Sequence, residues 1–248
     1  MNIWKRGKGF TLIELLIAIV IIGILMSLLI PAVNKIMENA RRLKGLNSLK
    51  QIATAYTQYS NDDVNGRNID AGNSPTGIIW ATKLAQAGYL NDPTVYCFSG
   101  DNGASRVLKK IIATSATTDG SDAWGSVPGT ESDQEFSVWV ISNVPTDAPA
   151  ATTPIAFTRG LPADGKWPNS GVYGTKGGYI AFLDGHVEWY DNLGTGEDEG
   201  QLVNWDTGKA TNSIQDTIPD SAQILSASGG DGGSVKGNGT SPTFGGGS

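Results

Sequence analysis

A long apolar run near the N-terminus is the most uneven feature of the chain. From Leu15 to Val33 every residue is apolar or small, apart from Ser27. A run of roughly 18 or more such residues is long enough to cross a membrane as a helix. The pattern therefore predicts a membrane-spanning segment, with the core of a secretory signal peptide as the first alternative.

Two features distinguish this run from a signal peptide. The run exceeds the ~7–15 residues of a signal-peptide core. Glu14 lies at its start, and an unpaired carboxylate in hydrocarbon costs a few kcal/mol, so such an acid is a functional candidate that needs a partner. A plain signal anchor with an idle Glu14 is the remaining alternative. The positive-inside rule gives no orientation, because basic residues lie on both sides of the run (Lys5, Arg6 and Lys8; Lys35, Arg41, Arg42 and Lys44).

Helical spacing continues beyond Pro31. Apolar residues recur every three or four positions and form one stripe of an amphipathic helix: Ile36, Ala40, Leu43, Leu46, Leu49, Ala53 and Tyr56. Turn-forming residues follow Asn61, so the helix is expected to end there. We expect its first half in a membrane and its second half on a globular head, with bends at Pro31 and Gly45.

The head shows weaker patterns. Residues 78–90 predict a short helix that ends near Gly88, and residues 136–144 alternate like a strand. Residues 179–190 predict a hairpin, with Asp184-Gly185 as a two-residue turn. Counting outward from that turn pairs the flanking residues and places four apolar residues on the face that covers the helix: Ile180, Phe182, Val187 and Trp189. The mixed outer face then holds Tyr179, Leu183, His186, Glu188 and Tyr190.

The predicted fold is α+β, with a long N-terminal helix packed on a small antiparallel sheet head that has long loops. The predicted divisions are a basic N-terminal segment (1–9), a transmembrane helix (10–33), an amphipathic helix (34–61), a globular head (62–228) and a Gly/Ser-rich flexible tail (229–248).

The composition of the chain excludes several kinds of binding site. The chain has 18 basic and 24 acidic residues and a net charge of -6, which argues against a nucleic-acid-binding surface. One cysteine and one histidine exclude an internal disulfide framework and the usual Cys/His zinc sites. Cys97 is expected to be a buried thiol or to form an intermolecular bridge. His186 follows a tight turn without a nucleophile motif, so we expect no enzyme activity.

The string from Lys8 to Glu14, Lys-Gly-Phe-Thr-Leu-Ile-Glu, resembles the cleavage region of type IV prepilins and type II secretion pseudopilins. The resemblance implies that a membrane peptidase cuts after Gly9, so that residues 1–9 are a prepilin leader, and that the new terminal residue, Phe10, is N-methylated. It also implies that the transmembrane helix (10–33) becomes the filament-core helix of the mature protein. Glu14 then occupies the fifth mature position and is expected to pair with the terminal amine, in its own helix or in a neighbouring subunit.

A second resemblance lies in the hairpin. The run Asp184-Gly-His-Val187 is similar to the C-terminal motif of a pseudopilin-like family common in planctomycetes, named for a His, nine residues, then Asp-Gly. Gly174 stands at the position of that His, so any role of the His does not carry over.

An acidic loop after the hairpin is a candidate calcium site, because hard cations take several carboxylate and carbonyl oxygens. Its residues are Asp191, Glu197, Asp198 and Glu199. Major pseudopilins, which this chain resembles, place calcium in a C-terminal loop. A solvated acidic loop is the alternative.

These resemblances imply a structural filament subunit, a pseudopilin of a type II secretion-like system. Its expected partners are identical and related pilin subunits, the prepilin peptidase and an inner-membrane assembly platform. The precursor would cross the inner membrane once, and the mature filament would be periplasmic or on the cell surface. A surface pilus subunit for adhesion or motility is one alternative. A membrane-anchored carbohydrate-binding module is another, with stacking surfaces from Trp124, Trp139, Trp167, Trp189 and Trp205.

Overall fold

The computed structural model describes residues 11–62, 69, 77–98, 101, 136–161, 165–194 and 201–226. The chain divides into two compact units, Met1–Leu43 and Lys44–Ser248. The predicted leader (1–9), the tail (229–248) and the acidic residues 197–199 lie outside the described residues. The five-part division from the sequence therefore stays a prediction.

One long helix, α1 (Leu12–Asp62), forms the described part of the first unit and continues into the second. Its end lies within one residue of the predicted Asn61. In the second unit its buried residues are Gly45, Leu49, Ile52, Ala53, Ala55 and Tyr56. The N-terminal part of the predicted stripe was wrongly assigned to the head core, because Ile36, Ala40 and Leu43 are exposed.

The rest of the second unit is built from short elements. Its helical segments are α2 (Gly77–Gln86), η1 (Pro93–Tyr96), η2 (Gly174–Lys176) and η3 (Ile214–Thr217). Its strands are β1 (Val138–Ser142), β2 (Pro154–Thr158), β3 (Gly178–Phe182), β4 (Val187–Tyr190), β5 (Leu202–Val203), β6 (Ala210–Thr211) and β7 (Gln223–Leu225). Five strands form an antiparallel sheet in the order β4-β3-β2-β1-β7, and β5 pairs with β6. The predicted α+β class is confirmed.

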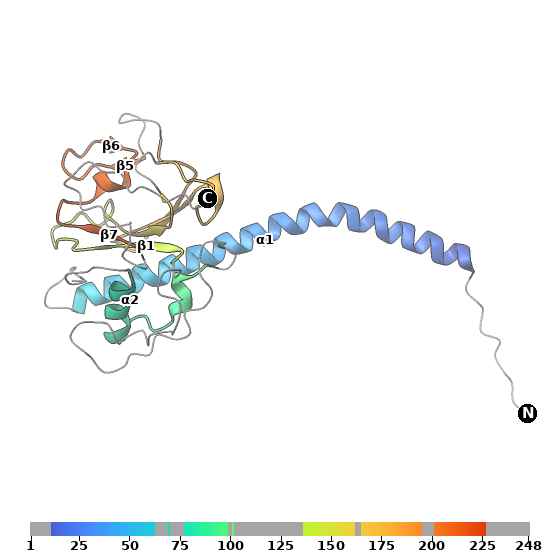
Figure 1. Ribbon diagram of the computed structural model, residues 1–248, viewed down its shortest axis with the longest axis horizontal. Helices are drawn as coiled ribbons and strands as arrows, with labels where there is room; N and C mark the ends of the chain where they lie inside the picture. Colours follow the sequence, from blue (N-terminus) through green and yellow to red (C-terminus); the bar gives the residue numbers. More distant parts are fainter. Residues whose placement is uncertain are drawn as a thin grey trace, which may run out of the picture. The chain divides into compact units, whose positions relative to one another are not determined.

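The main sheet is covered on both faces, because every residue of β1, β2 and β3 is buried. Within the second unit, α2 and the adjoining part of α1 lie on one side of the sheet, and β5 and β6 lie on the other (Figure 1). The Tyr56 and Trp80 rings stack at 5.8 Å between the two helices, and the Trp80 indole donates to the Ile141 carbonyl of β1. The predicted outer face of the hairpin was therefore wrong for Tyr179, Leu183 and Tyr190, which are buried.

The predicted helix and first strand are confirmed with narrower bounds. α2 ends before Gly88, which has φ of +84°. The Gly88 amide donates to the Ala85 carbonyl and the Tyr89 amide to the Leu84 carbonyl. These two bonds form a Schellman motif, which satisfies the last carbonyls of the helix. The glycine therefore ends α2 for the reason that the sequence suggested.

The hairpin exists, but its register is shifted by one residue from the prediction. Ile180 pairs with Glu188 and Ala181 with Val187, so the loop has three residues, 183–185. Gly185 has φ of +89°, which is the left-handed residue that closes a three-residue loop with a bulge. An Asp-Gly pair suits both loop lengths, so the sequence alone did not separate them.

The shift changes the partners of every side chain in the hairpin. Trp189 packs edge-on against Tyr179 with ring centroids 4.8 Å apart, instead of lying beside Ile180. Glu188 takes the place opposite Ile180 and accepts a hydrogen bond from the Tyr190 hydroxyl at 2.8 Å. Burial and this carboxylate both raise the pKa of Tyr190. β4 is the edge strand of the sheet, which explains why Val187 and Trp189 are only half-buried.

A buried polar cluster that the sequence did not suggest joins the sheet to the segment after η1. The Arg159 guanidinium lies 2.7 Å from Asp101 Oδ1, and the two side chains are 10% and 2% exposed. Ser137 Oγ donates to Asp101 Oδ2 and accepts from the Phe98 amide, both at 2.8 Å. Because each charge is paired and hydrogen-bonded, this cluster avoids the cost of an isolated buried ion.

Gly45 allows α1 to approach the loops of the head closely. A Cβ at this position would lie 3.1 Å from the Phe98 ring and closer still to the Tyr173 hydroxyl. The sequence suggested that Gly45 bends the helix; the structure gives it a packing role instead.

We expect Gly45→Ala to lower the free energy of unfolding of the head by about 1–3 kcal/mol, as is typical of overpacking. Without the clash, alanine in a helix would stabilise by up to ~1 kcal/mol over glycine. The control is Gly23→Ala in the same helix, where nothing lies within 4 Å of the added methyl group. Thermal unfolding followed by tryptophan fluorescence in detergent would measure both, and equal midpoints for the two variants would contradict the packing role.

Candidate functional site

The first turn of α1 is closed by a reciprocal pair of side chains. The Thr11 amide and hydroxyl both donate to Glu14 Oε2, at 2.9 and 2.7 Å. The Glu14 amide donates back to the Thr11 hydroxyl at 3.3 Å. This is a capping box, in which the residue before the helix and the third helical residue satisfy each other's backbone donors. The spacing Thr-x-x-Glu is a sequence signal for it, which the sequence analysis did not use.

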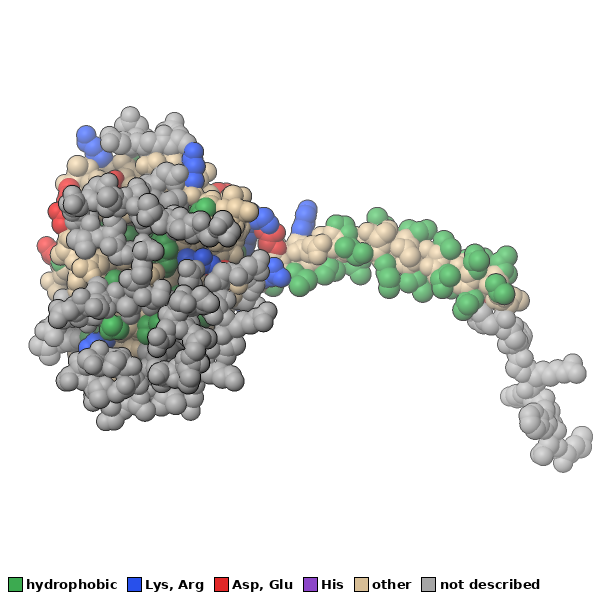
Figure 2. All heavy atoms as spheres, viewed as in Figure 1, with side chains coloured by type: hydrophobic (Ala, Val, Ile, Leu, Met, Phe, Trp, Pro, Cys, Tyr) green, Lys and Arg blue, Asp and Glu red, His purple; other side chains and the backbone are tan. Residues whose placement is uncertain are grey.

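Apolar side chains cover α1 after this cap. No residue from 11 to 37 is buried, and Figure 2 shows hydrophobic side chains along this part of the helix. The helix contains an 18-residue window of mean hydropathy 3.0, none of it buried. It is the one helix among the described residues that is long and apolar enough to cross a membrane. We call the apolar surface of residues 12–33 the assembly surface.

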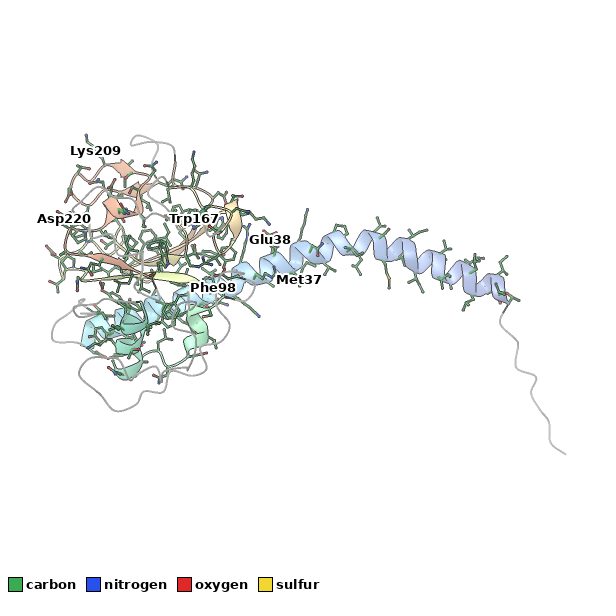
Figure 3. The ribbon with its side chains drawn as sticks, in the orientation of Figure 1. Met37, Glu38, Phe98, Trp167, Lys209 and Asp220 are labelled. Carbon is green, nitrogen blue, oxygen red and sulfur yellow. The ribbon has the colours of Figure 1, made fainter. Side chains whose placement is uncertain are left out.

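A charged segment follows the assembly surface on the same helix. Lys35 and Arg41 are exposed, and Arg42 forms an ion pair with Glu38 at 3.0 Å, one helical turn apart. Figure 3 labels Glu38 on this part of α1. The change from apolar to charged side chains begins at Asn34 and is sharp, as expected where a helix leaves hydrocarbon.

Of the predicted processing and assembly residues, Glu14 is described, whereas Gly9 and Phe10 lie outside the described residues. Glu14 lies where the resemblance requires, in the first turn of an apolar helix. Its carboxylate is held by Thr11 of the same chain. A terminal amine at Phe10 would therefore meet a carboxylate that already accepts hydrogen bonds from Thr11, and the amine would add a positive charge beside it.

The predicted calcium loop is described only at Asp191. Asp191 is exposed, and its Oδ1 accepts a hydrogen bond from the Trp189 indole at 2.6 Å. Glu197, Asp198 and Glu199 lie outside the described residues. Among the residues that are described, no three His, Cys, Asp or Glu side chains gather in a way that could hold a metal ion. The calcium site therefore stays a prediction.

The single histidine belongs to the hairpin loop. Its ring stacks on Phe182, with centroids 4.3 Å apart and an interplanar angle of 8°, and its Nδ1 lies 2.5 Å from Asp184 Oδ1. Partial burial raises the pKa of Asp184, but hydrogen bonds from the His186 backbone and ring outweigh it, so the net shift is downward. These two contacts hold the His186 ring within the loop.

Cys97 is a free, half-buried thiol. Burial, and to a smaller extent the Asp101 carboxylate, raise its pKa to about 11. Because the thiolate is the reactive form, this environment makes the thiol a poor nucleophile. The predicted burial of this thiol is partial, and the alternative of an intermolecular bridge stays a prediction.

The tryptophans offer little surface for stacking on sugars. Trp139 and Trp167 are buried, and Trp167 lies within the body of the second unit (Figure 3). Trp189 and Trp205 are half-buried, and Trp124 lies outside the described residues. The carbohydrate-binding alternative thus loses two of its five candidate residues.

Comparison with known proteins agrees with the geometry of the N-terminus. Residues 4–30 match the model of the prokaryotic N-terminal methylation motif. The chain is also similar to the type II secretion system core protein G of Klebsiella pneumoniae, with 30% identity over 91 residues, 35% of this chain and 65% of the relative. The protein of the same name from Aeromonas hydrophila gives 30% identity over 91 residues, 35% of this chain and 64% of the relative.

A third relative of that name, from Pectobacterium carotovorum subsp. carotovorum, is 36% identical over 58 residues, 23% of this chain and 37% of the relative. The matches thus span slightly less than two thirds of the length of two of these relatives and little more than a third of the length of the third. No solved structure matches the chain. The predicted prepilin-type N-terminus is confirmed, whereas the resemblance of the Asp184-Gly-His-Val187 segment to a second family is not tested.

We expect Thr11→Val to loosen the start of α1, because valine keeps the side-chain shape but removes the capping hydroxyl. Loss of a cap costs about 1 kcal/mol, which corresponds to about fivefold faster amide exchange in the first turn. Hydrogen exchange of the full chain in detergent micelles would measure this. Thr11→Ser is the matched control and should exchange like the wild type; unchanged exchange in Thr11→Val would contradict a working capping box.

Proposed function

We propose, starting from a chain whose N-terminus is of the prepilin type, that this protein is a structural filament subunit, a pseudopilin of a type II secretion-like system. The observation that carries the proposal is the assembly surface: a helix of about 33 Å between residues 12 and 33, at 1.5 Å per residue, with no buried residue and one carboxylate in its first turn. Such a surface is stable only in a bilayer or against other apolar helices.

Processing follows from the prepilin-type motif. The precursor crosses the inner membrane once through the assembly surface, with Lys5, Arg6 and Lys8 on the cytoplasmic side. The prepilin peptidase cuts after Gly9, and Phe10 becomes the methylated N-terminus. The mature helix then leaves the membrane through an inner-membrane assembly platform and packs with identical and related subunits in a periplasmic or surface filament.

Glu14 supplies the polar contact of assembly. Its carboxylate, already capped by Thr11, accepts the cationic amine of Phe10 from a neighbouring subunit. In an apolar filament core an unpaired amine is costly, so only a register that brings the two charges together is stable. A buried pair of this kind selects the register more than it adds stability.

The head performs no chemistry in this proposal. The relatives are named as core proteins of a secretion system, which favours the secretion role over a surface pilus. Deleting the gene separates the two roles: loss of secreted proteins supports the pseudopilin, whereas loss of adhesion or motility with an unchanged secreted proteome supports the pilus subunit.

We expect the mature protein to begin at Phe10 and to carry a methyl group on its N-terminus. Removal of Lys5, Arg6 and Lys8 leaves 15 basic residues (18 minus 3) against 24 acidic residues, so the net charge changes from -6 to -9. N-terminal sequencing and intact mass of the membrane-extracted protein would check this. A start beyond Ala18 would instead indicate ordinary signal-peptide processing.

We expect Glu14→Leu to abolish filaments while the head stays folded, because the variant leaves the Phe10 amine unpaired at a cost of a few kcal/mol per interface. Ser27→Leu is the matched control, since it removes a polar group from the same apolar segment; the Ser27 hydroxyl bonds only to the Ile24 carbonyl of its own helix. Filament yield in sheared fractions would be compared at equal protein levels. Normal filaments from Glu14→Leu would remove this residue from the mechanism.

A further inference from the structure

We propose that three cationic side chains just after the assembly surface bind the phosphate groups of anionic phospholipids. These residues, Lys35, Arg41 and Arg42, are here called the basic band. The inference rests on the proposed membrane-spanning role of residues 12–33, but it does not depend on filament assembly.

The position of the basic band along α1 matches a headgroup layer. Residues 12–33 span about 33 Å, close to the ~30 Å hydrocarbon core of a bilayer. At 1.5 Å per residue, the three cations then follow Val33 by about 3 to 14 Å along the helix axis. This interval covers the headgroup region and the Debye length of ~8 Å beyond it at physiological salt.

The direction of the side chains favours the same partner. In an α-helix the Cα–Cβ bonds tilt toward the N-terminus, which for α1 is the end that carries the assembly surface. Long cationic side chains on this helix therefore lean back toward the membrane, where an Arg guanidinium can bind phosphate with two parallel hydrogen bonds. Lys35 and Arg41 are exposed, as this contact requires, whereas Arg42 is half-buried beside Glu38.

The positive charge of the basic band is unusual for a segment that follows a membrane-spanning helix on the translocated side. In the proposed topology it follows the membrane on the translocated side, where the positive-inside rule disfavours Lys and Arg. The chain as a whole is acidic, with a net charge of -6. Glu38 is the single acid within the band and pairs with Arg42 at 3.0 Å, so the segment 35–42 keeps a net charge of +2, three cations against one carboxylate. An anionic surface next to the hydrocarbon compensates this charge.

The test measures lipid selectivity of the full chain reconstituted as a monomer in phosphatidylcholine membranes. Trace spin-labelled phosphatidylglycerol or phosphatidylcholine reports the fraction of motionally restricted lipid by electron paramagnetic resonance. We expect the triple variant K35Q/R41Q/R42Q to lower the wild-type preference for phosphatidylglycerol by at least about threefold, because it removes three cations near the membrane surface. The leader cations are present in both proteins and cancel in the comparison.

Further measurements test the direction of the effect and provide a control. Glu38→Gln removes the competing carboxylate and should raise the preference, whereas 0.5 M NaCl should lower that of the wild type. The charge-matched control K50Q/K83Q/K176Q changes exposed lysines of the second unit and should keep the wild-type preference. Near-ultraviolet circular dichroism verifies that each variant has a folded head.

Three results would overturn the proposal. An unchanged preference in the band variant would exclude lipid binding by the basic band. An equal loss in the control would show a general charge effect. Failure of the chain to float with the membranes would refute the membrane-spanning role itself, and this readout is separate from lipid selectivity.

Discussion

The structure depends on an apolar surface that the chain cannot cover by itself. Residues 12–33 carry bulky aliphatic side chains around the whole circumference of α1, and none of them is buried. In water this surface would favour aggregation, so the helix requires a bilayer or a set of like helices. In the proposed assembly, the carboxylate in its first turn distinguishes one helix register from another, because aliphatic packing alone is nearly indifferent to sliding.

The head, in contrast, buries the C-terminal part of the same helix beside a small sheet. The sheet has only five strands and is covered on both faces. Close approaches of α1 join it to other parts of the head: Gly45 leaves room for the Phe98 ring, and Tyr56 lies flat against Trp80 of α2. Polar contacts such as the Asp101–Arg159 pair fix described segments outside the regular elements.

The features that the sequence predicted are local ones. The apolar run, the end of α1, α2 with its glycine stop, the strand β1 and the hairpin all follow from patterns within about twenty residues. The hairpin register was missed because Asp-Gly suits two loop lengths, and the choice depends on how the loop meets residues 150–153 of the neighbouring segment. The burial of Tyr179 and Tyr190 and the pairing of Asp101 with Arg159 join residues far apart in sequence, which no local pattern encodes. In the candidate site, Glu14 was found from the motif, whereas its partner Thr11 was overlooked although the spacing contained it.

The polar cluster around Asp101 also bears on how this protein can diversify. Ser137 bonds to Tyr96 through its amide, and its hydroxyl joins the Phe98 amide to the Asp101 carboxylate. Asp101 and Ser137, 36 positions apart in the sequence, are therefore held together at one point. Each doubling of a loop's length adds only ~0.6 kcal/mol to its closure cost. The cost of closing the chain between these two anchors thus depends only weakly on how many residues lie between them, and a change in that number would leave this attachment of the sheet in place.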